Sequence, residues 1–286
     1  MTKKIFSVAV LMAMMVTAAL SMNTATAFAS TADVITVNTP AAAVEGKVMI
    51  AGTSTLTKVY MAVKAPTGEV AVYPVDVKNG SFAKDVWLRY GTGSYSVWLG
   101  GNASKFDGTV KIAVDNSAAV DEFTAPSGYV DSDNPSIIAI ANSIVTPGMS
   151  DAVKVKAIHD WVAKHISYDY AGYLAGKNDV NKASDIIAKG EGMCRDYSVA
   201  FAAIARAAGI STKVVYGTVT EAKGWAPQAH AWNQVLLGGK WVAVDTTFDA
   251  GYIKNGKFVA SLKSTYVAMA STEFAKTHTT EKVTVF

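Results

Sequence analysis

Short runs of alternating apolar and polar residues, the pattern of half-buried β-strands, follow a long apolar stretch near the start of the chain. Turn-forming residues such as Pro66-Thr67-Gly68 and Asn79-Gly80 separate these runs. Seven runs share the pattern: 34–37, 47–51, 58–64, 70–73, 82–88, 95–99 and 110–114. Seven short strands at this spacing predict an all-β, immunoglobulin-like sandwich domain over residues 30–115.

A helical period replaces the alternation in the second half of the chain. Between the two patterns, residues 116–135 have the Asp-, Ser-, Ala-, Pro- and Gly-rich composition of a linker. Helices are predicted over 150–166, over 183–189 and from Cys194 until Gly209. Strands are predicted over 213–219, 230–237 and 240–246. Helices followed by antiparallel strands predict an α+β domain over residues 136–286.

The apolar stretch near the start has the features of a secretory signal peptide over residues 1–29. Lys3 and Lys4 precede an apolar run, and Ala27-Phe28-Ala29 offers a cleavage site of small residues. An uncleaved membrane anchor is the alternative. No later stretch approaches the roughly 18 apolar residues of a transmembrane segment. We therefore expect a secreted, extracellular protein, either soluble or associated with the cell wall.

Composition and charge exclude several classes of function. The chain is 50% hydrophobic and 17% charged, which is typical of a globular protein. Of its 26 basic and 23 acidic residues, residues 1–29 contain two lysines and no acid, so the net charge falls from +3 to +1 on cleavage. So small a charge gives no electrostatic basis for nucleic-acid binding. The single cysteine excludes an intramolecular disulfide and any multi-cysteine metal site. No calcium loop or nucleotide motif is present, and we expect no metal and no cofactor.

The single cysteine, Cys194, lies where a helix is predicted to begin, directly after Gly190-Glu191-Gly192. Backbone N–H groups and the positive end of the helix dipole at such a position favour a thiolate and can hold an oxyanion. A structural cysteine is the alternative for this position considered alone. The predicted sandwich contains neither Cys nor His. All four histidines belong to the second domain: His159, His165, His230 and His278.

The strands on either side of Gly238-Gly239 supply partners for the thiol. If the two glycines form a two-residue loop, His230 and Asp245 fall on one face of the sheet as diagonal neighbours, about 7–8 Å apart. An acid there holds the imidazole in the tautomer that leaves its other nitrogen free to deprotonate a thiol. The sequence therefore predicts a Cys194, His230 and Asp245 triad.

The prediction depends on the length of the loop. With two loop residues, Leu237 faces Lys240, Trp232 lies opposite Asp245, and Thr247 lies opposite His230. A three-residue loop would place His230 and Asp245 on opposite faces, and they would then be no more than exposed polar residues of the strands.

The order of motifs around these residues covers about residues 140–286. The motifs are Gly192-x-Cys194-x-x-Tyr197-Ser198, His230-Ala231-Trp232-Asn233 and Trp241-x-x-Val244-Asp245-x-Thr247-Phe248-Asp249, with flanking segments at 158–162, 166–169 and 273–279. This combination closely resembles the bacterial transglutaminase-like superfamily. The resemblance implies a papain-like core in which the cysteine helix packs on an antiparallel sheet. It also implies Cys194 as nucleophile, His230 as general base and then acid, and Asp245 as the group that orients the imidazole.

Two aromatic residues are candidates for supporting roles. The backbone N–H of Cys194 supplies one oxyanion donor, and Tyr168, in the family-like Ser167-Tyr168-Asp169, is a candidate for a neighbouring polar position. A packed aromatic at a helix end is the alternative for Tyr168. Trp232 is expected to cover the triad from solvent, with filling of the sheet face as the alternative.

The residues and the resemblance predict one acyl-enzyme intermediate that can react with either of two acceptors. Attack by a thiolate on an amide carbonyl gives a thioester acyl-enzyme, which water hydrolyses or an amine converts into a cross-link. We therefore expect a secreted thiol enzyme acting on proteins or peptides, with its sandwich domain positioning it on a cell-wall or extracellular-matrix target. A non-catalytic extracellular or cell-wall binding protein built on the same domain is the alternative.

Overall fold

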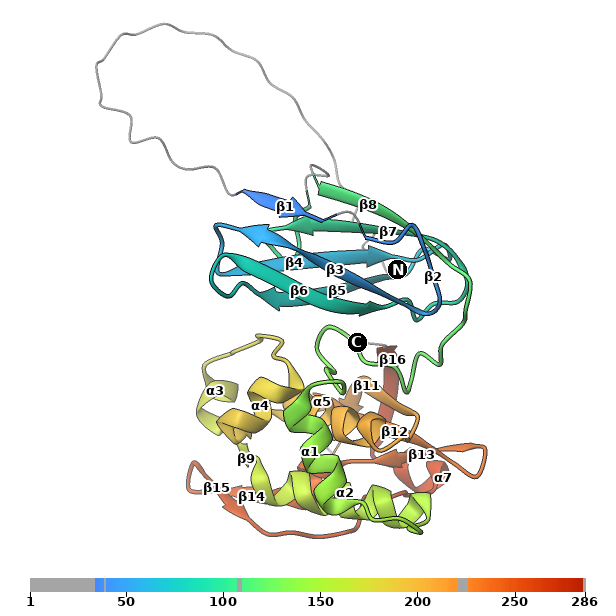
Figure 1. Cartoon of the computed structure of the whole chain (residues 1–286). Helices are drawn as coiled ribbons and strands as arrows, with labels where there is room; N and C mark the ends of the chain where they lie inside the picture. The colour runs from blue at the N-terminus through green and yellow to red at the C-terminus, as the bar shows by residue number, and fades with distance from the viewer. Residues whose placement is uncertain (1–33, 39, 107–109, 221–225, 285–286) are drawn as a thin grey trace, which may run out of the picture. The chain divides into compact units, whose positions relative to one another are not determined.

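The computed structural model describes residues 34–38, 40–106, 110–220 and 226–284 (Figure 1). The predicted signal peptide lies outside these residues. Within the described part of the chain, none of the helices combines the length and the hydrophobicity needed to cross a membrane.

The first part of the described chain is a β-sandwich. Its strands are β1 (Ile35–Val37), β2 (Ala43–Val44), β3 (Lys47–Ser54), β4 (Lys58–Lys64), β5 (Val70–Asp76), β6 (Ser81–Trp87), β7 (Gly93–Gly100) and β8 (Val110–Asn116). One sheet has the order β1-β3-β6 and the other the order β2-β8-β7-β4-β5. The two sheets confirm the all-β prediction, while the immunoglobulin-like relationship stays a prediction. The sequence pattern missed β2, because two residues are too short to show alternation.

Alternation along the strands builds the core of this sandwich. On β3, for example, Val48 and Ile50 are buried while Lys47 and Met49 are exposed. The inward residues of both sheets form one apolar cluster that includes Ile50, Tyr95 and Val97, all fully buried. Burial of these side chains is the main driving force for forming the sandwich.

The segment predicted as a linker is irregular in backbone but packed. It contains no helix or strand between Asn116 and Pro135. The Arg206 guanidinium donates to the carbonyl of Ala125 over 3.1 Å, and the Ser184 hydroxyl donates to the carboxylate of Asp131 over 2.5 Å. Its composition indicated an irregular backbone, but not that the segment is held by buried polar contacts.

The second part of the described chain combines helices with a four-stranded antiparallel sheet, which confirms the α+β class. Its longer helices are α1 (Pro135–Ile144), α2 (Asp151–His165), α4 (Ala183–Lys189) and α5 (Cys194–Ala207). The sheet has the order β13-β12-β11-β16, with β11 (Thr212–Val219), β12 (Gln228–Leu237), β13 (Lys240–Val244) and β16 (His278–Thr284). The prediction omitted α1, although Asn134 caps it by accepting from the backbone of Ser136 and Pro135 opens its first turn.

Helix α5 covers one face of this sheet. Val214, Val235 and Val244 belong to the same apolar cluster as the buried residues of α5. The opposite face carries Trp232, which packs with Val215, Ala243 and Phe274. The helix is also tied to the sheet by Asn233, whose side-chain N–H donates to the carbonyl of Ser198 over 2.9 Å.

The hairpin has the predicted register but a shorter second strand. Leu237 pairs with Lys240 and Asn233 with Val244, as a two-residue loop requires. The prediction of a strand to residue 246 was wrong. The chain turns into α6 (Thr246–Ala250), because the Asp245 carboxylate accepts from the backbone N–H of Phe248 and caps that helix. Thr247 is therefore helical and not a strand residue opposite His230.

Short elements complete the domain, and none of them was predicted. They are β9 (Ser167–Tyr168), α3 (Tyr170–Leu174), β10 (Glu191–Gly192), β14 (Gly251–Lys254), β15 (Lys257–Ala260) and α7 (Ser271–Phe274). Strand β9 pairs in parallel with β10 immediately before α5. These elements are too short to show a periodic pattern, yet they surround the start of α5 and the end of β13.

Gly217→Ala is expected to destabilise the second domain. A Cβ at this position would lie 2.0 Å from the Thr279 carbonyl oxygen and 2.7 Å from the Trp232 ring, so β16 would have to move away from β11. We expect the free energy of unfolding to fall by about 2–3 kcal/mol, as in overpacked cores. Urea unfolding followed by tryptophan fluorescence measures the change. Thr218→Ala, on the next residue of the strand, is the control, and an equal loss in both variants would contradict this explanation.

Candidate active site

Cys194 is the first residue of α5, and it is partly exposed. The chain reaches it from α4 through Gly190, which has a φ of 69° and ends that helix in the left-handed conformation. The Asp196 carboxylate accepts from the backbone N–H of Met193 over 2.8 Å and so caps the helix start. The thiol therefore lies at the end of a 14-residue helix where backbone N–H groups point outward.

Steric contacts explain why residue 192 of the Gly192-x-Cys194 motif is glycine. A Cβ on Gly192 would lie 2.4 Å from the Cβ of Asp196, closer than carbon atoms can approach. Gly192 also pairs with Tyr168 across the β9 and β10 strands. The capped helix start and this parallel pair thus require glycine two residues before Cys194.

His230 and Asp245 meet at the end of the hairpin. The Nε2 atom of His230 lies 2.7 Å from Oδ2 of Asp245, and both side chains are buried. Because Nε2 is occupied by the carboxylate, Nδ1 is the nitrogen left for Cys194, which acts on the His230 imidazole and raises its pKa. The structure thus brings together the three residues of the predicted triad.

In the His230–Asp245 pair, charge interactions outweigh burial in their effect on the two pKa values. Burial lowers the pKa of His230, but the Asp245 carboxylate and Cys194 raise it, and the net result is a pKa of about 10. Burial raises the pKa of Asp245, but His230 and His278 hold the pKa of this carboxyl well below its usual range. At neutral pH an ionised Asp245 therefore holds a protonated His230, the form that pairs with a thiolate.

A second histidine reaches the same carboxylate from β16. The Nε2 atom of His278 lies 3.1 Å from Oδ2 of Asp245, and the His278 ring is 5.7 Å from that of His230. In the sequence His278 stands out only as one of four histidines of the second domain, because no strand was predicted over β16 (His278–Thr284). The one signal that included it was the resemblance of residues 273–279 to the ending of the family.

Aromatic rings enclose the two histidines. Phe248 stacks on His230 at 4.7 Å and Phe274 stacks on His278 at 3.7 Å. Trp232 lies 5.2 Å from His278 and 6.1 Å from His230, and it is 1% exposed. Trp232 therefore shields the histidines on one side and also fills this face of the sheet. Its position fits both the expected cover over the site and the alternative, a residue that fills the sheet face. An apolar enclosure of this kind strengthens the charge interactions inside it.

Tyr168 pairs with Gly192, two residues before Cys194. It is half-buried on β9, and burial, followed by the charge of Cys194, raises the pKa of its hydroxyl. The phenol therefore stays protonated at neutral pH and keeps an O–H that can donate. This position fits the predicted supporting role of Tyr168 in the site.

Two histidines and a carboxylate lie close enough together in the site to be considered as ligands of a metal ion. His230, Asp245 and His278 bring potential ligand atoms within 4.8 Å of one another. The two distances to Asp245 Oδ2 are hydrogen-bond distances, and each Nε2 must carry a hydrogen to donate to an ionised carboxylate. A metal ion would require those nitrogens without their hydrogens. The geometry therefore fits hydrogen bonding, and we assign no metal ligands.

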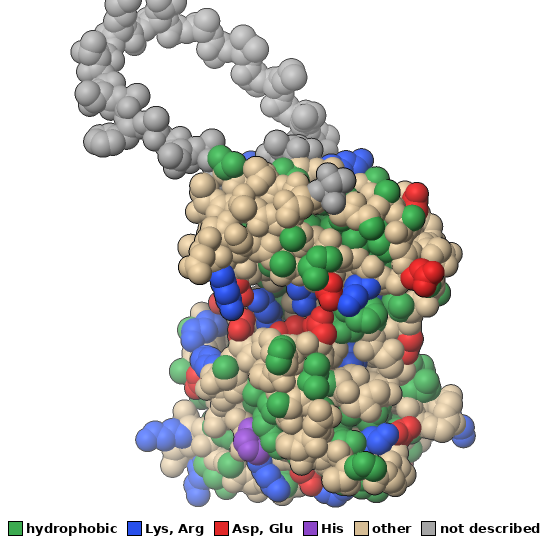
Figure 2. Space-filling view, in the orientation of Figure 1, with side chains coloured by type: hydrophobic (Ala, Val, Ile, Leu, Met, Phe, Trp, Pro, Cys, Tyr) green, Lys and Arg blue, Asp and Glu red, His purple; other side chains and the backbone are tan. Residues whose placement is uncertain are grey.

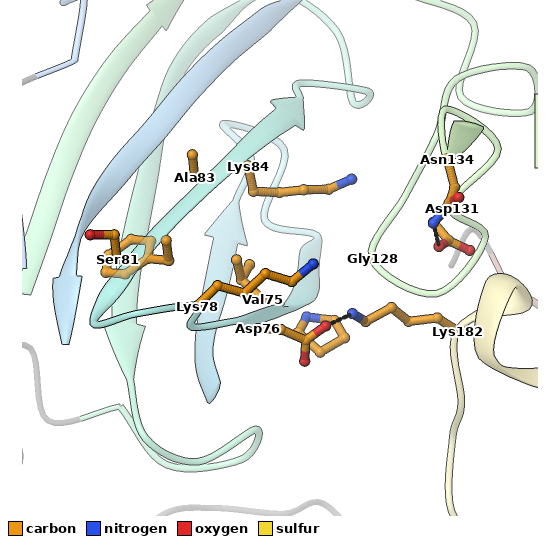
Figure 3. A pocket seen from close by; sticks show the side chains of 12 residues that line it. Val75, Asp76, Lys78, Ser81, Ala83, Lys84, Gly128, Asp131, Asn134 and Lys182 are labelled. Atoms are coloured by element: carbon orange, nitrogen blue, oxygen red, sulfur yellow. Dashed lines mark hydrogen bonds and ion pairs between the residues drawn. The ribbon is translucent and has the colours of Figure 1, made fainter. Parts of the chain in front are cut away.

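The triad lies outside the larger surface pocket. That pocket, of about 450 Å³, is lined by charged residues, among them Lys182, whose ammonium lies 2.7 Å from the Asp76 carboxylate (Figure 3). A smaller pocket of about 270 Å³ adjoins Met193 and Asp196 at the start of α5. Neither lining contains a histidine or Cys194. On the face shown in Figure 2, basic and acidic side chains of the described residues are interspersed.

A family model and two relatives match this chain. Residues 138–246 match the model described as the transglutaminase-like superfamily. The human and mouse proteins named kyphoscoliosis peptidase are each 29% identical over 123 residues, which are 40% of this chain and 18% of the relative's length.

The solved structures that resemble the chain are more distant. A structure described as a putative cysteine protease from Cytophaga hutchinsonii has 16% identity and a TM-score of 0.39, covering 76% of this chain and 80% of the other. Red sea bream transglutaminase has 10% identity and a TM-score of 0.32, covering 75% of this chain and 50% of the other.

His230→Ala is expected to slow the alkylation of Cys194 by iodoacetamide at about pH 6. Without the imidazolium, the Cys194 thiolate would lose the charge that stabilises it, so we expect a decrease on the order of 100-fold. Mass spectrometry of the modified protein against time gives the rate. His165→Ala removes an exposed histidine stacked on Trp161 and is the control. Equal rates in all three proteins would contradict the triad.

Stability is expected to depend on pH through the same pair. The pKa of Asp245 is lowered by folding, so its contribution is present above about pH 4 and is lost as the pH falls. The pKa of His230 is raised, so its contribution is complete below about pH 6.5 and is lost as the pH rises through about 10. His230→Gln should therefore lose less stability than the wild type between neutral and alkaline pH in urea unfolding. Parallel curves for the two proteins would refute this assignment.

Proposed function

We propose that the protein is a thiol enzyme that acts on the amide bonds of proteins or peptides, since residues 138–246 match the transglutaminase-like superfamily model. The supporting observation is the buried contact of 2.7 Å between His230 and Asp245, together with the influence of Cys194 on the pKa of the same imidazole. The peptidase name of the curated relatives agrees with amide chemistry.

The first half of the proposed reaction forms a thioester. The Cys194 thiolate attacks the carbonyl carbon, a C–S bond forms, and the electron pair of the C=O double bond moves to oxygen. When the tetrahedral intermediate collapses, the C–N bond breaks and the His230 imidazolium gives its proton to the leaving amine. Asp245 stays ionised throughout and keeps the ring in the orientation that this transfer needs.

The second half of the reaction releases the acyl group. Neutral His230 now takes a proton from water or from an amine, which attacks the thioester carbonyl, and the Cys194 thiolate leaves. Water gives a carboxylic acid and makes the protein a hydrolase. A primary amine gives a new amide and makes the protein a transferase.

Two donors are proposed for the oxyanion. The backbone N–H of Cys194 lies in the first turn of α5, where N–H groups lack partners within the helix. The second is the hydroxyl of Tyr168, on the strand that pairs with the residue two before Cys194. Donors fixed in place before the reaction stabilise the developing charge without reorganisation.

The place of action is proposed from the sequence. The signal peptide expected over residues 1–29 would export the protein, so the substrate would be extracellular or part of the cell wall. The β-sandwich contains no Cys and no His and has no obvious part in the chemistry. We propose that it positions the enzyme on its protein or peptide target.

An assay with two readouts tests the proposal. The protein is incubated with a glutamine-containing protein and a labelled primary amine, and mass spectrometry follows both label incorporation and new peptide termini. Label without cleavage indicates transfer, and cleavage indicates proteolysis. Cys194→Ala should lose either activity while keeping its circular dichroism spectrum, since a small residue replaces a small one. If the wild type gives neither product, the enzyme proposal fails and a binding role is favoured.

A further inference from the structure

Asp245 has more hydrogen-bond partners than a triad needs. Its Oδ1 accepts from the backbone N–H of Phe248 over 3.1 Å, and its Oδ2 is 2.7 Å from His230 and 3.1 Å from His278. The side chains of Asp245 and His278 are both 0% exposed. A buried charge is stable only when donors surround it, and here two of the three are imidazoles.

The chemistry of the carboxylate fixes the tautomer of His278. An ionised carboxylate only accepts hydrogen bonds, so Nε2 of His278 must carry the hydrogen. Its Nδ1 lies 2.8 Å from the hydroxyl oxygen of Thr277. When the ring is neutral, Nδ1 is an acceptor, so the Thr277 hydroxyl, which also lies 3.4 Å from the Phe274 carbonyl oxygen, donates to Nδ1 over the shorter distance. The Thr277 side chain thus stabilises the tautomer that donates to Asp245.

Packing fixes the orientation of the His278 ring. It stacks on Phe274 at 3.7 Å with an angle of 21° between the planes, and Trp232 meets it nearly edge-on at 75°. The pairing of His278 with Val219 holds its backbone at the start of β16. The ring has therefore no freedom to leave the carboxylate without displacing its neighbours.

Building on the triad proposed above, we infer that His278 is a positioning residue of the active site, which holds Oδ2 of Asp245 through its Nε2–H. With one imidazole alone, the carboxylate could turn about its side-chain bonds and weaken its contact with His230. Two imidazoles that converge on one oxygen prevent this rotation. His278 thereby fixes the His230 ring for proton transfer with Cys194, although it does not touch the reacting atoms.

The ionisable groups around His278 are few. Among the described residues, Asp245 faces it from the β13–α6 junction and His230 from β12, and the Tyr266 ring lies 5.8 Å away. Cys194 lies beyond His230. Removing the His278 N–H therefore acts on His230 mainly through the position of the Asp245 carboxylate. A carboxylate that has turned away from His230 stabilises the imidazolium form less, so His230 would lose its proton at lower pH.

His278→Phe tests the inference, because phenylalanine preserves the stack on Phe274 and removes both ring nitrogens. The rate of Cys194 alkylation by iodoacetamide is measured from about pH 4 to 11. We expect a decrease of about 10-fold at neutral pH, within the range caused by small misplacements of catalytic groups. We also expect the alkaline step of the profile, where His230 loses its proton, to move to lower pH. His278→Gln, which retains an N–H donor, should recover part of the rate.

Controls separate this inference from the proposal on which it rests. His165→Phe removes the other histidine stacked on an aromatic ring and should leave the profile unchanged. Thr277→Val removes only the hydroxyl and should shift the profile in the same direction as His278→Phe, by less, which provides a test if His278→Phe fails to fold. A folded His278→Phe protein with the wild-type rate and profile would overturn the inference. If His230→Ala also alkylates at the wild-type rate, the triad itself is wrong.

Discussion

The buried carboxylate of Asp245 is the constraint on which the site depends. It lies at the junction of β13 and α6, and its three donors come from α6, β12 and β16. A charge removed from water must be compensated locally, so the relative positions of these elements are coupled to one side chain. The same carboxylate caps a helix and orients an imidazole. A substitution of Asp245 would therefore remove the cap of α6 and the contact with His230 together.

Local sequence signals predicted the parts of the site that depend on local geometry. Gly238-Gly239 set the register of the hairpin, which brings His230 near Asp245, and the glycines before Cys194 marked the start of α5. The same reasoning extended the strand too far. Strand periodicity carries no information about a carboxylate that caps the next helix, so the turn at Asp245 was missed.

Contacts between distant residues escaped prediction for a different reason. His278 is 33 residues from Asp245, and its strand pairs with β11 rather than with the neighbouring hairpin. Nothing in the pattern of β16 specifies that partner. The segment over residues 116–135 shows the same limit, because composition indicates an irregular backbone but not the burial of Asp131 or its bonds with Ser184. Only the resemblance of residues 273–279 to the final segment of the family indicated that this part of the chain contributes to the domain.

The position of β16 in the sequence has a consequence for when the thiol becomes reactive. Residues of the site come from α5, β12, the β13–α6 junction and β16, so long-range contacts must form before the charges are aligned. Such contacts form late in folding, because loop closure comes first and is entropically unfavourable. An incompletely folded chain would carry an ordinary cysteine and no aligned base. The alignment of His230 with Cys194 therefore requires the completed domain, because the contacts that hold Asp245 come from elements far apart in the sequence.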